Sequence, residues 1–123
     1  MSLAVSTQTP PVGTKLVKET DAKSTPDNSV TGAAGAVYMI EVDNTGNPAD
    51  GAFFKIYDLA APDTYVDYPD FVLKVPANQR RALAIPLGWD FTDLSFCVSS
   101  SAAKNIAGST DMPNPVEVSI VTT

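Results

Sequence analysis

Short apolar runs whose large side chains recur with a period of two, each closed by turn residues, are the feature that most constrains this chain. Side chains of a β-strand point to opposite faces in turn, so a period of two is typical of strands with one buried face. Such runs recur from Gly35 to the C-terminus and are separated by turn-rich stretches such as NTGNPADG. The 10 prolines and 7 glycines leave little room for long helices. The sequence therefore predicts an all-β protein.

Each predicted strand places its large apolar side chains on one face, and a sheet with one apolar face must be covered by a second layer. We therefore expect an antiparallel β-sandwich of about six to eight strands. Jelly-roll and immunoglobulin-like sandwiches share this alternation and differ in which strands pair, so both orders remain open. The residues expected to face the core are Tyr38, Ile40, Val42, Phe54, Ile56, Phe71, Leu73, Val75, Leu83, Ile85, Leu94, Phe96, Val98, Val116, Val118 and Ile120.

The N-terminal part of the chain differs from the rest in composition. Residues 1–12 are rich in Ser, Thr and Pro, and Pro10 and Pro11 favour an extended backbone that cannot join the centre of a sheet. Residues 13–20 alternate weakly and predict an edge strand, whereas residues 21–35 are polar and predict a loop or a mobile link. We expect an extended arm and linker over residues 1–35 and one sandwich domain over residues 36–123.

Charge and missing residue types exclude several classes of function. The net charge of -6 makes phosphate backbones poor partners, so no nucleic acid is expected. No apolar run approaches the length that spans a bilayer, and the chain does not start as a signal peptide does, so no membrane partner is expected. The single cysteine, Cys97, excludes an internal disulfide and gives no support for a zinc site. Synthesis in a reducing cytoplasm fits these features.

Catalysis has little chemical basis in this composition. Without histidine the chain lacks the commonest general base and metal ligand, so no Ser-His-Asp arrangement can form. Cys97 has no histidine to activate it and is interpreted as a small, inert hydrophobic residue. Paired carboxylates are the remaining acid–base device, and nothing in the sequence identifies such a pair. We expect no enzyme activity, no catalytic residues and no cofactor.

An aspartate-rich stretch, YDLAAPDTYVDYPD, is the candidate for a metal site. Calcium prefers carboxylate and carbonyl oxygens from flexible loops, and this stretch offers Asp58, Asp63, Asp67 and Asp70. Their spacing does not match an EF-hand loop, and aspartate also stabilises turns through local hydrogen bonds. We interpret the stretch as a solvated, turn-rich loop that holds no metal.

Three aromatic residues are candidates for contact with a ligand or a partner. Tyr65 and Tyr68 lie in the aspartate-rich loop, and Trp89 follows the short IPLG motif. Exposed aromatic side chains can stack on sugar rings or anchor a protein interface. The alternative is that they fold back onto the end of the sandwich as part of its core.

A second set of residues is predicted to form an interface. Two adjacent arginines suit carboxylate recognition, although a solvated hairpin turn is the alternative for them. Two aromatic residues alternate away from the predicted core, and the two adjacent prolines of the arm could reach a neighbour. The interface candidates are Pro10, Pro11, Phe53, Tyr57, Arg80 and Arg81.

Residues 37–123 contain a series of short motifs in a distinctive order. These are Y-x-x-x-x-D-N-T at residues 38–45, F-K-I-Y-D at 54–58, V-P-A at 75–77, I-P-L-G at 85–88 and P-V-x-V-x-I-V at 115–121. In this order they resemble a group of small virion proteins from tailed bacteriophages, cyanophages in particular. The resemblance does not extend to residues 1–35, and residues 63–70 resemble a local insertion.

The resemblance implies a structural role without an active site. Proteins of this group are capsid cement or decoration proteins, or small parts of fibres and tails, and they are typically β-sandwiches that assemble as homotrimers. The expected partners are further copies of this chain and a major capsid protein, on the outer surface of the virion. The alternative is a carbohydrate-binding or fibre module of the host-adsorption apparatus, with Tyr65, Tyr68 and Trp89 as stacking platforms.

Overall fold

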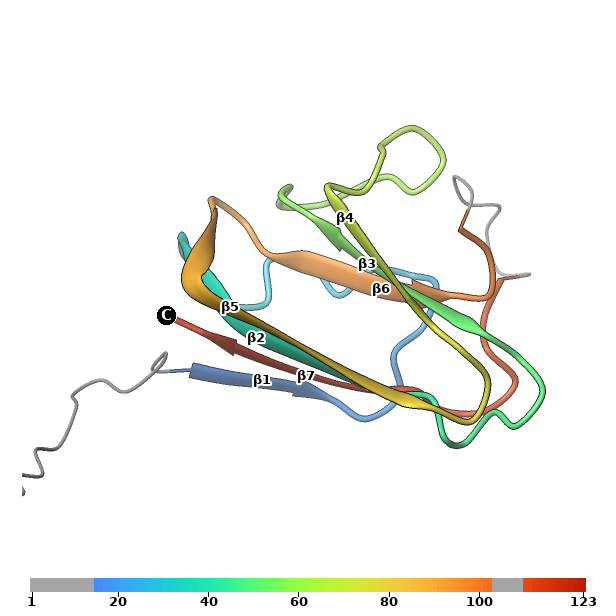
Figure 1. Ribbon diagram of the computed structural model, residues 1–123. Helices are drawn as coiled ribbons and strands as arrows, with labels where there is room; N and C mark the ends of the chain where they lie inside the picture. The colour runs from blue at the N-terminus through green and yellow to red at the C-terminus, as the bar shows by residue number, and fades with distance from the viewer. Residues whose placement is uncertain (1–14, 103–109) are drawn as a thin grey trace, which may run out of the picture.

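The computed structural model describes residues 15–102 and 110–123, which form an all-β fold of two antiparallel sheets (Figure 1). The prediction of an antiparallel sandwich is confirmed. Within these residues the strands are β1 (Lys15–Glu19), β2 (Gly35–Asp43), β3 (Ala52–Tyr57), β4 (Phe71–Val75), β5 (Arg80–Phe91), β6 (Ser95–Ser99) and β7 (Glu117–Thr122). The 4-stranded sheet has the order β1-β7-β2-β5, and the 3-stranded sheet has the order β4-β3-β6.

The strand order is that of a jelly roll. In an immunoglobulin-like sandwich the first strand lies beside the second, whereas here β7 lies between β1 and β2. The first half of the chain pairs with the second half in a nested way, β3 with β4, β2 with β5 and β1 with β7. Nested antiparallel pairs that pass back and forth between two sheets are characteristic of the jelly roll. Strand pairing thus decides between the two orders that side-chain alternation leaves open.

Residues 22–30 lie along the edge of β6, where a further strand of a jelly roll would be. Asp27 forms an isolated β-bridge with Phe96, with backbone hydrogen bonds of 2.8 and 3.1 Å in the two directions. The Val98 N–H donates to the Lys23 C=O at 2.9 Å. The predicted edge strand is confirmed as β1, but the segment expected to be a mobile link is bonded to the three-stranded sheet.

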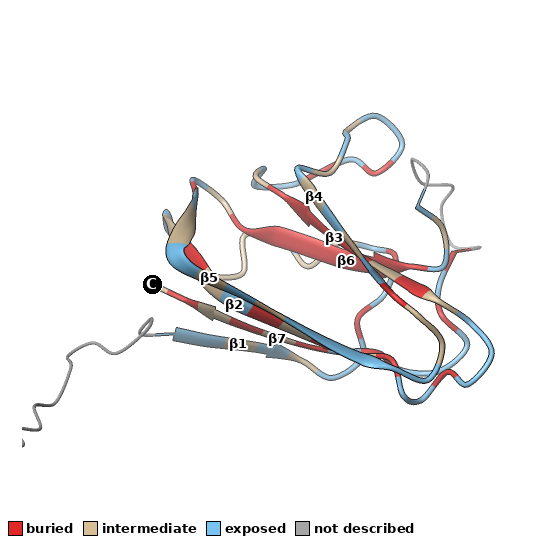
Figure 2. Cartoon of the chain, in the orientation of Figure 1, coloured by how far each residue is buried: buried red, intermediate tan, exposed pale blue. Residues whose placement is uncertain are grey.

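The core between the two sheets consists mainly of the side chains that the alternation pattern placed inward (Figure 2). The rings of Phe54 and Phe96 lie at its centre, with centroids 5.8 Å apart. Phe71, Leu73 and Ile85 are partly buried and pack against this core. The predicted core residues that are at most 1% exposed are Ile40, Val42, Phe54, Ile56, Val75, Leu94, Phe96, Val98, Val116, Val118 and Ile120.

The inward position predicted for Tyr38 is wrong, because β2 and β5 pair through a bulge. Val37 pairs with Trp89 and Met39 pairs with Ala84, so residues 85–88 lie opposite Tyr38. Extra residues in one strand of a pair change which side chains face inward. Val37, which is 0% exposed, therefore takes the core position, and Tyr38 is only half-buried.

The outer face of the three-stranded sheet is buried around Tyr57 and Cys97, because the loop of residues 58–70 lies against this part of it. The Ser95 hydroxyl donates to the Leu59 C=O at 2.6 Å, which holds the start of this loop to β6. Tyr57 and Cys97, which point to this face, are 1% and 2% exposed. The prediction of Tyr57 as an interface residue is therefore wrong.

Two buried asparagines join the turns at one end of the sandwich. Asn44 and Asn47 are both 0% exposed. The Asn44 Nδ2 donates to the C=O groups of Asp50 and Pro76, at 2.9 and 3.2 Å. The Asn47 Nδ2 donates to Asn44 Oδ1 at 2.9 Å and to the Asn114 C=O at 3.0 Å, and the Asn114 N–H donates to Asn47 Oδ1 at 2.8 Å. The turns after β2 and β4 and the segment before β7 are thus one hydrogen-bonded unit.

Asp27 makes the stability of the fold depend on pH. Burial, and to a smaller extent the nearby Glu19, raise the pKa of Asp27 from 3.8 to about 6. Between about pH 4 and pH 6 the folded protein therefore binds more protons than the unfolded chain, so its free energy of unfolding falls as the pH rises. We expect Asp27→Asn to raise the free energy of unfolding at pH 7 by about 1 kcal/mol, because water screens this partly exposed group.

Urea denaturation at pH 4 and at pH 7 measures this effect. Asp50→Asn is the matched control, since Asp50 is exposed and the substitution removes the same charge. The difference in stability between the two pH values should shrink in the Asp27→Asn protein alone. An unchanged difference in that protein would contradict the role of Asp27.

Candidate functional site

A pocket of about 260 Å³ lies between the two sheets, beside the bulge in β5. Both sheets contribute to its walls, which are apolar except for one carboxylate. Its lining residues are Ile40, Ile56, Asp70, Phe71, Ile85, Gly88 and Trp89. Apolar concave sites with few polar groups are typical of ligand binding. Of the three predicted contact aromatics, the pocket lining includes Trp89 alone.

The bulge in β5 brings Ile85 and Trp89 to the same pocket. Gly88 has a φ of 78°, and a Cβ at this position would lie 3.0 Å from Cε1 of Tyr38. Only glycine adopts this backbone without strain and leaves room for the tyrosine ring. Leu87, at the bulge, is 96% exposed, whereas Trp89 is half-buried.

The carboxylate in the pocket lining belongs to a hydrogen-bonded group of aspartates. Asp70 Oδ2 accepts a hydrogen bond from the Asp58 N–H at 2.7 Å. In turn, Asp58 Oδ1 accepts from the N–H groups of Thr92 and Asp93, at 2.8 and 2.9 Å. These bonds connect the end of β3, the start of β4 and the turn between β5 and β6. They span 12 to 35 positions along the chain, so Asp58 and Asp70 connect separate segments, and the predicted role in local turns does not describe them.

The other two aspartates of the loop, Asp63 and Asp67, stabilise its turns through local hydrogen bonds. Asp63 Oδ1 accepts from the Tyr65 N–H at 3.0 Å, and Asp67 Oδ2 accepts from the Asp63 N–H at 2.8 Å. Within residues 15–102 and 110–123, no group of three or more His, Cys, Asp or Glu side chains is placed to hold a metal ion. Tyr65 and Tyr68 are 57% and 73% exposed, so they do not fold back into the core.

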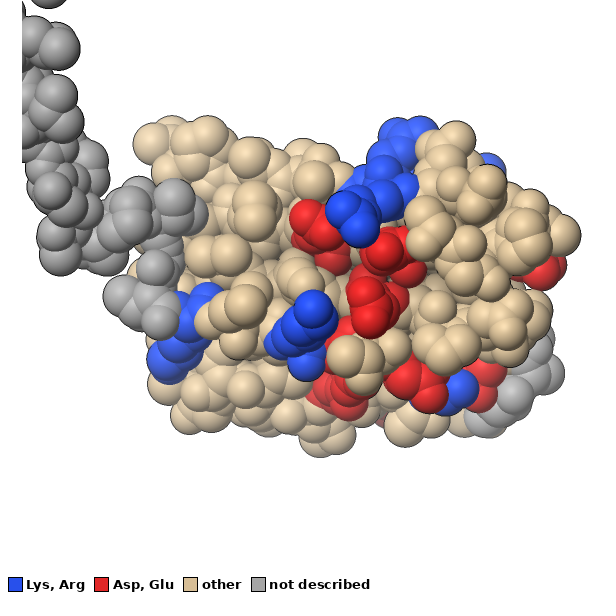
Figure 3. All heavy atoms as spheres, turned by 90° about the horizontal axis from the view of Figure 1, so that it is seen from below, with Lys and Arg blue, Asp and Glu red and all other residues tan. Residues whose placement is uncertain are grey.

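The outer face of the four-stranded sheet carries an apolar row that crosses every strand. Leu16 pairs with Val121, Val121 with Met39, and Met39 with Ala84. Leu16 and Met39 are 66% and 37% exposed, Ala84 is exposed and Val121 is half-buried. Figure 3 views this side of the molecule, where an area without charged side chains lies beside a band of them. Uncovered apolar patches bounded by polar residues mark interaction surfaces.

The charged band on this face includes one of the predicted interface arginines. Arg80 lies 3.5 Å from Glu41 and 3.4 Å from Asp43, which are on the neighbouring strand β2. Arg81 is exposed and donates to Gln79 Oε1 at 3.3 Å. Both arginines remain accessible to a partner, but Arg80 already pairs with carboxylates of its own chain.

The remaining interface candidates are dispersed. Phe53 is half-buried on the outer face of the three-stranded sheet, with the Lys74 Nζ 5.9 Å from its ring centroid. It therefore does not share a surface with Arg80. Pro10 and Pro11 lie outside the described residues.

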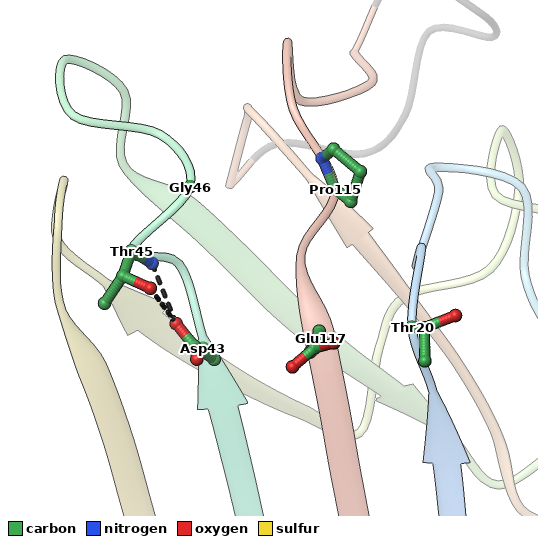
Figure 4. Close-up of a pocket in the computed structure, with 6 residues that line it drawn as sticks. All are labelled: Thr20, Asp43, Thr45, Gly46, Pro115 and Glu117. Atoms are coloured by element: carbon green, nitrogen blue, oxygen red, sulfur yellow. Dashed lines mark hydrogen bonds between the residues drawn. The ribbon is translucent and has the colours of Figure 1, made fainter.

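A second hollow, of about 220 Å³, lies at the end of the four-stranded sheet (Figure 4). Its lining includes the carboxylates of Asp43 and Glu117, which are cross-strand neighbours. Hydrogen bonds from the side chain and backbone of Thr45 lower the pKa of Asp43. Asp43 therefore stays ionised and holds the turn after β2. This role accounts for a carboxylate at this position, so no ligand needs to be invoked for it.

The buried cysteine is not an activated nucleophile. Burial raises the pKa of the Cys97 thiol to about 11, which keeps it protonated at neutral pH. Its cross-strand neighbour Lys55 is 1% exposed, and burial lowers the pKa of this amine. Burial also raises the pKa of Tyr57. The interpretation of Cys97 as a small hydrophobic residue agrees with its burial.

Sequence reasoning did not identify the apolar row or most of the pocket lining. Both depend on which strands are neighbours, although the exposed Leu16 is visible in the sequence as an apolar residue between Lys15 and Lys18. None of the described segments forms a helix of the length and hydropathy needed to cross a membrane.

Comparisons of the chain with protein-family models, with curated proteins and with solved structures found no match.

Proposed function

We propose that this chain is a structural protein of a phage virion that decorates the outside of the capsid. In this function it assembles as a homotrimer and binds between subunits of the major capsid protein, after synthesis in the host cytoplasm. The observation that supports it most is the apolar row of Leu16, Val121, Met39 and Ala84 on an open sheet face. Motif order from residue 37 to residue 123 supports the viral assignment by resemblance.

The physical properties of the sandwich suit a cement protein. A protein that bridges neighbouring shell subunits stabilises the assembled state alone, because it binds that state and not the free subunits. Several copies held together multiply modest contacts into strong attachment. A broad and shallow apolar row on a sheet is suited to a flat protein surface, whereas a small-molecule ligand needs a concave site.

Attachment to capsids tests this proposal. Met39→Glu places a charge in the middle of the apolar row, and Val72→Glu is the matched control, because Val72 is 42% exposed on the three-stranded sheet. We expect purified capsids to bind the wild-type and Val72→Glu proteins with similar affinity and the Met39→Glu protein about tenfold more weakly. Melting temperatures measured alongside should show that all three proteins are folded. Equal attachment of the two variants, or no attachment of the wild type, would contradict the proposal.

Carbohydrate binding in the host-adsorption apparatus is the second candidate. The observation that favours it is the exposure of Tyr65 and Tyr68, because exposed aromatic rings can stack on sugar rings. A glycan array separates the two candidates, since saturable glycan binding that is lost in Tyr68→Ala would support adsorption over decoration.

A further inference from the structure

We propose that the pocket between the two sheets binds one large apolar side chain of a basic segment in the partner protein. This inference deepens the proposed function, because it states what kind of sequence the partner presents. It concerns a surface distinct from the apolar row, with the floor of the pocket formed by Ile40 and Ile56 of the core. A pocket of about 260 Å³ suits a single side chain better than a whole peptide.

The walls of the pocket explain the apolar part of the ligand. Phe71, Ile85 and Trp89 are half-buried, so each has apolar surface left that a ligand could cover. Removing such surface from water favours binding in proportion to the area buried. Gly88 forms part of the wall, and its missing side chain leaves room for the ring of Tyr38.

Charge around the pocket explains the basic part of the ligand. Asp70 lies in the lining, Asp58 and Asp93 are joined to it by hydrogen bonds, and Asp90 follows Trp89. No lysine or arginine occurs in residues 56–73 or 82–102, which contribute most of the pocket and its rim. A lysine or arginine on either side of the apolar anchor would therefore be attracted to the rim.

The chain provides its own spectroscopic reporter for this site. It contains 1 tryptophan, Trp89, which lines the pocket. A side chain that enters the pocket displaces water from the indole ring, so the emission should shift to shorter wavelength. Fluorescence therefore reports changes in the surroundings of Trp89, the tryptophan that lines this pocket.

The experiment titrates the wild-type protein with the peptide acetyl-GKFRKG-amide and follows tryptophan emission. Acetyl-GKARKG-amide lacks the anchor, and acetyl-GEFEEG-amide has the anchor with the opposite charge. We expect a saturable shift with the first peptide and affinities at least about tenfold weaker with the other two. The proposal would be overturned if acetyl-GKFRKG-amide caused no shift of the emission, or if the alanine peptide caused the same shift. A larger shift with methyl glucoside than with the first peptide would also overturn it.

Variants of the pocket provide the second measurement. Ile85→Phe fills the pocket and should abolish the saturable shift, and Asp70→Asn should weaken binding about threefold at low salt. Glu117→Gln removes a charge at the second hollow and should leave the affinity unchanged. If Asp70→Asn and Glu117→Gln weakened peptide binding equally, the affinity would depend on the net charge of the protein and not on the charge at the pocket. That result would overturn the proposal that the partner segment is basic. Because these assays use peptides alone, their failure leaves the capsid attachment result to be decided separately.

Discussion

Asn47→Ala should lower the free energy of unfolding by about 2–4 kcal/mol, one of the largest effects of any polar substitution in this chain. The Asn47 amide makes hydrogen bonds of 2.9, 3.0 and 2.8 Å, two of them to the backbone of Asn114. Its removal leaves the buried Asn44 Oδ1 without this donor and separates the turn after β2 from the segment before β7. A buried polar group that loses its partner retains the full cost of desolvation.

Thermal and urea denaturation measure this loss, which should lower the melting temperature by about 10 °C. Asn114→Ala is the matched control, because Asn114 contributes backbone atoms to the same network and its side chain is exposed. We expect the control to change the free energy of unfolding by about 0.5 kcal/mol or less. Equal losses in the two proteins would show that the network does not depend on the buried amide.

Phe54→Ala should lower the free energy of unfolding by about 3–5 kcal/mol. Phe54 lies on β3, the central strand of the three-stranded sheet, where it is 0% exposed and contacts Phe96. Truncation removes most of its buried apolar surface and leaves a cavity that the surrounding strands can fill only in part. Since a domain of this size is stable by about 5–15 kcal/mol, a large share of its stability would be lost.

The neighbouring residue provides the control for this substitution. Phe53→Ala changes the same residue type in the same strand, but Phe53 is half-buried on the outer face beside Lys74. We expect a loss of about 1–2 kcal/mol for Phe53→Ala, measured by urea denaturation at pH 7. If the two substitutions cost the same, the centre of the core does not lie between the sheets at Phe54.

The period-two pattern was sufficient to predict the class of fold and most of its core. Residues such as Phe54, Phe96 and Ile120 lie at alternate positions of their runs, and all three are buried between the sheets. This local signal is reliable because burying one face of a strand requires an apolar side chain at every second position. The turn role of Asp63 and Asp67 could be predicted for a similar reason, since aspartate bonds to nearby backbone groups.

Burial of the second face of a sheet could not be read from the same pattern. Tyr57 was expected to be an interface residue because it alternates away from Phe54 and Ile56, yet it is 1% exposed. Alternation shows which side chains share a face, and only the path of the loop over residues 58–70 shows that the other face is covered too. The burial of Asn44 and Asn47 was not predicted either, because the sequence of a turn does not show which distant turns it contacts.

By itself, the sequence determined that this protein is an antiparallel β-sandwich with no histidine chemistry and an acidic surface. Tertiary structure alone decided the jelly-roll order, the bulge that turns Tyr38 away from the core, and the neighbours of Trp89 in the pocket. The physical reason is that alternation acts between adjacent residues, whereas pairing joins residues as distant as Leu16 and Val121. The apolar row on the four-stranded sheet exists only through that pairing, because each of its members lies on a different strand.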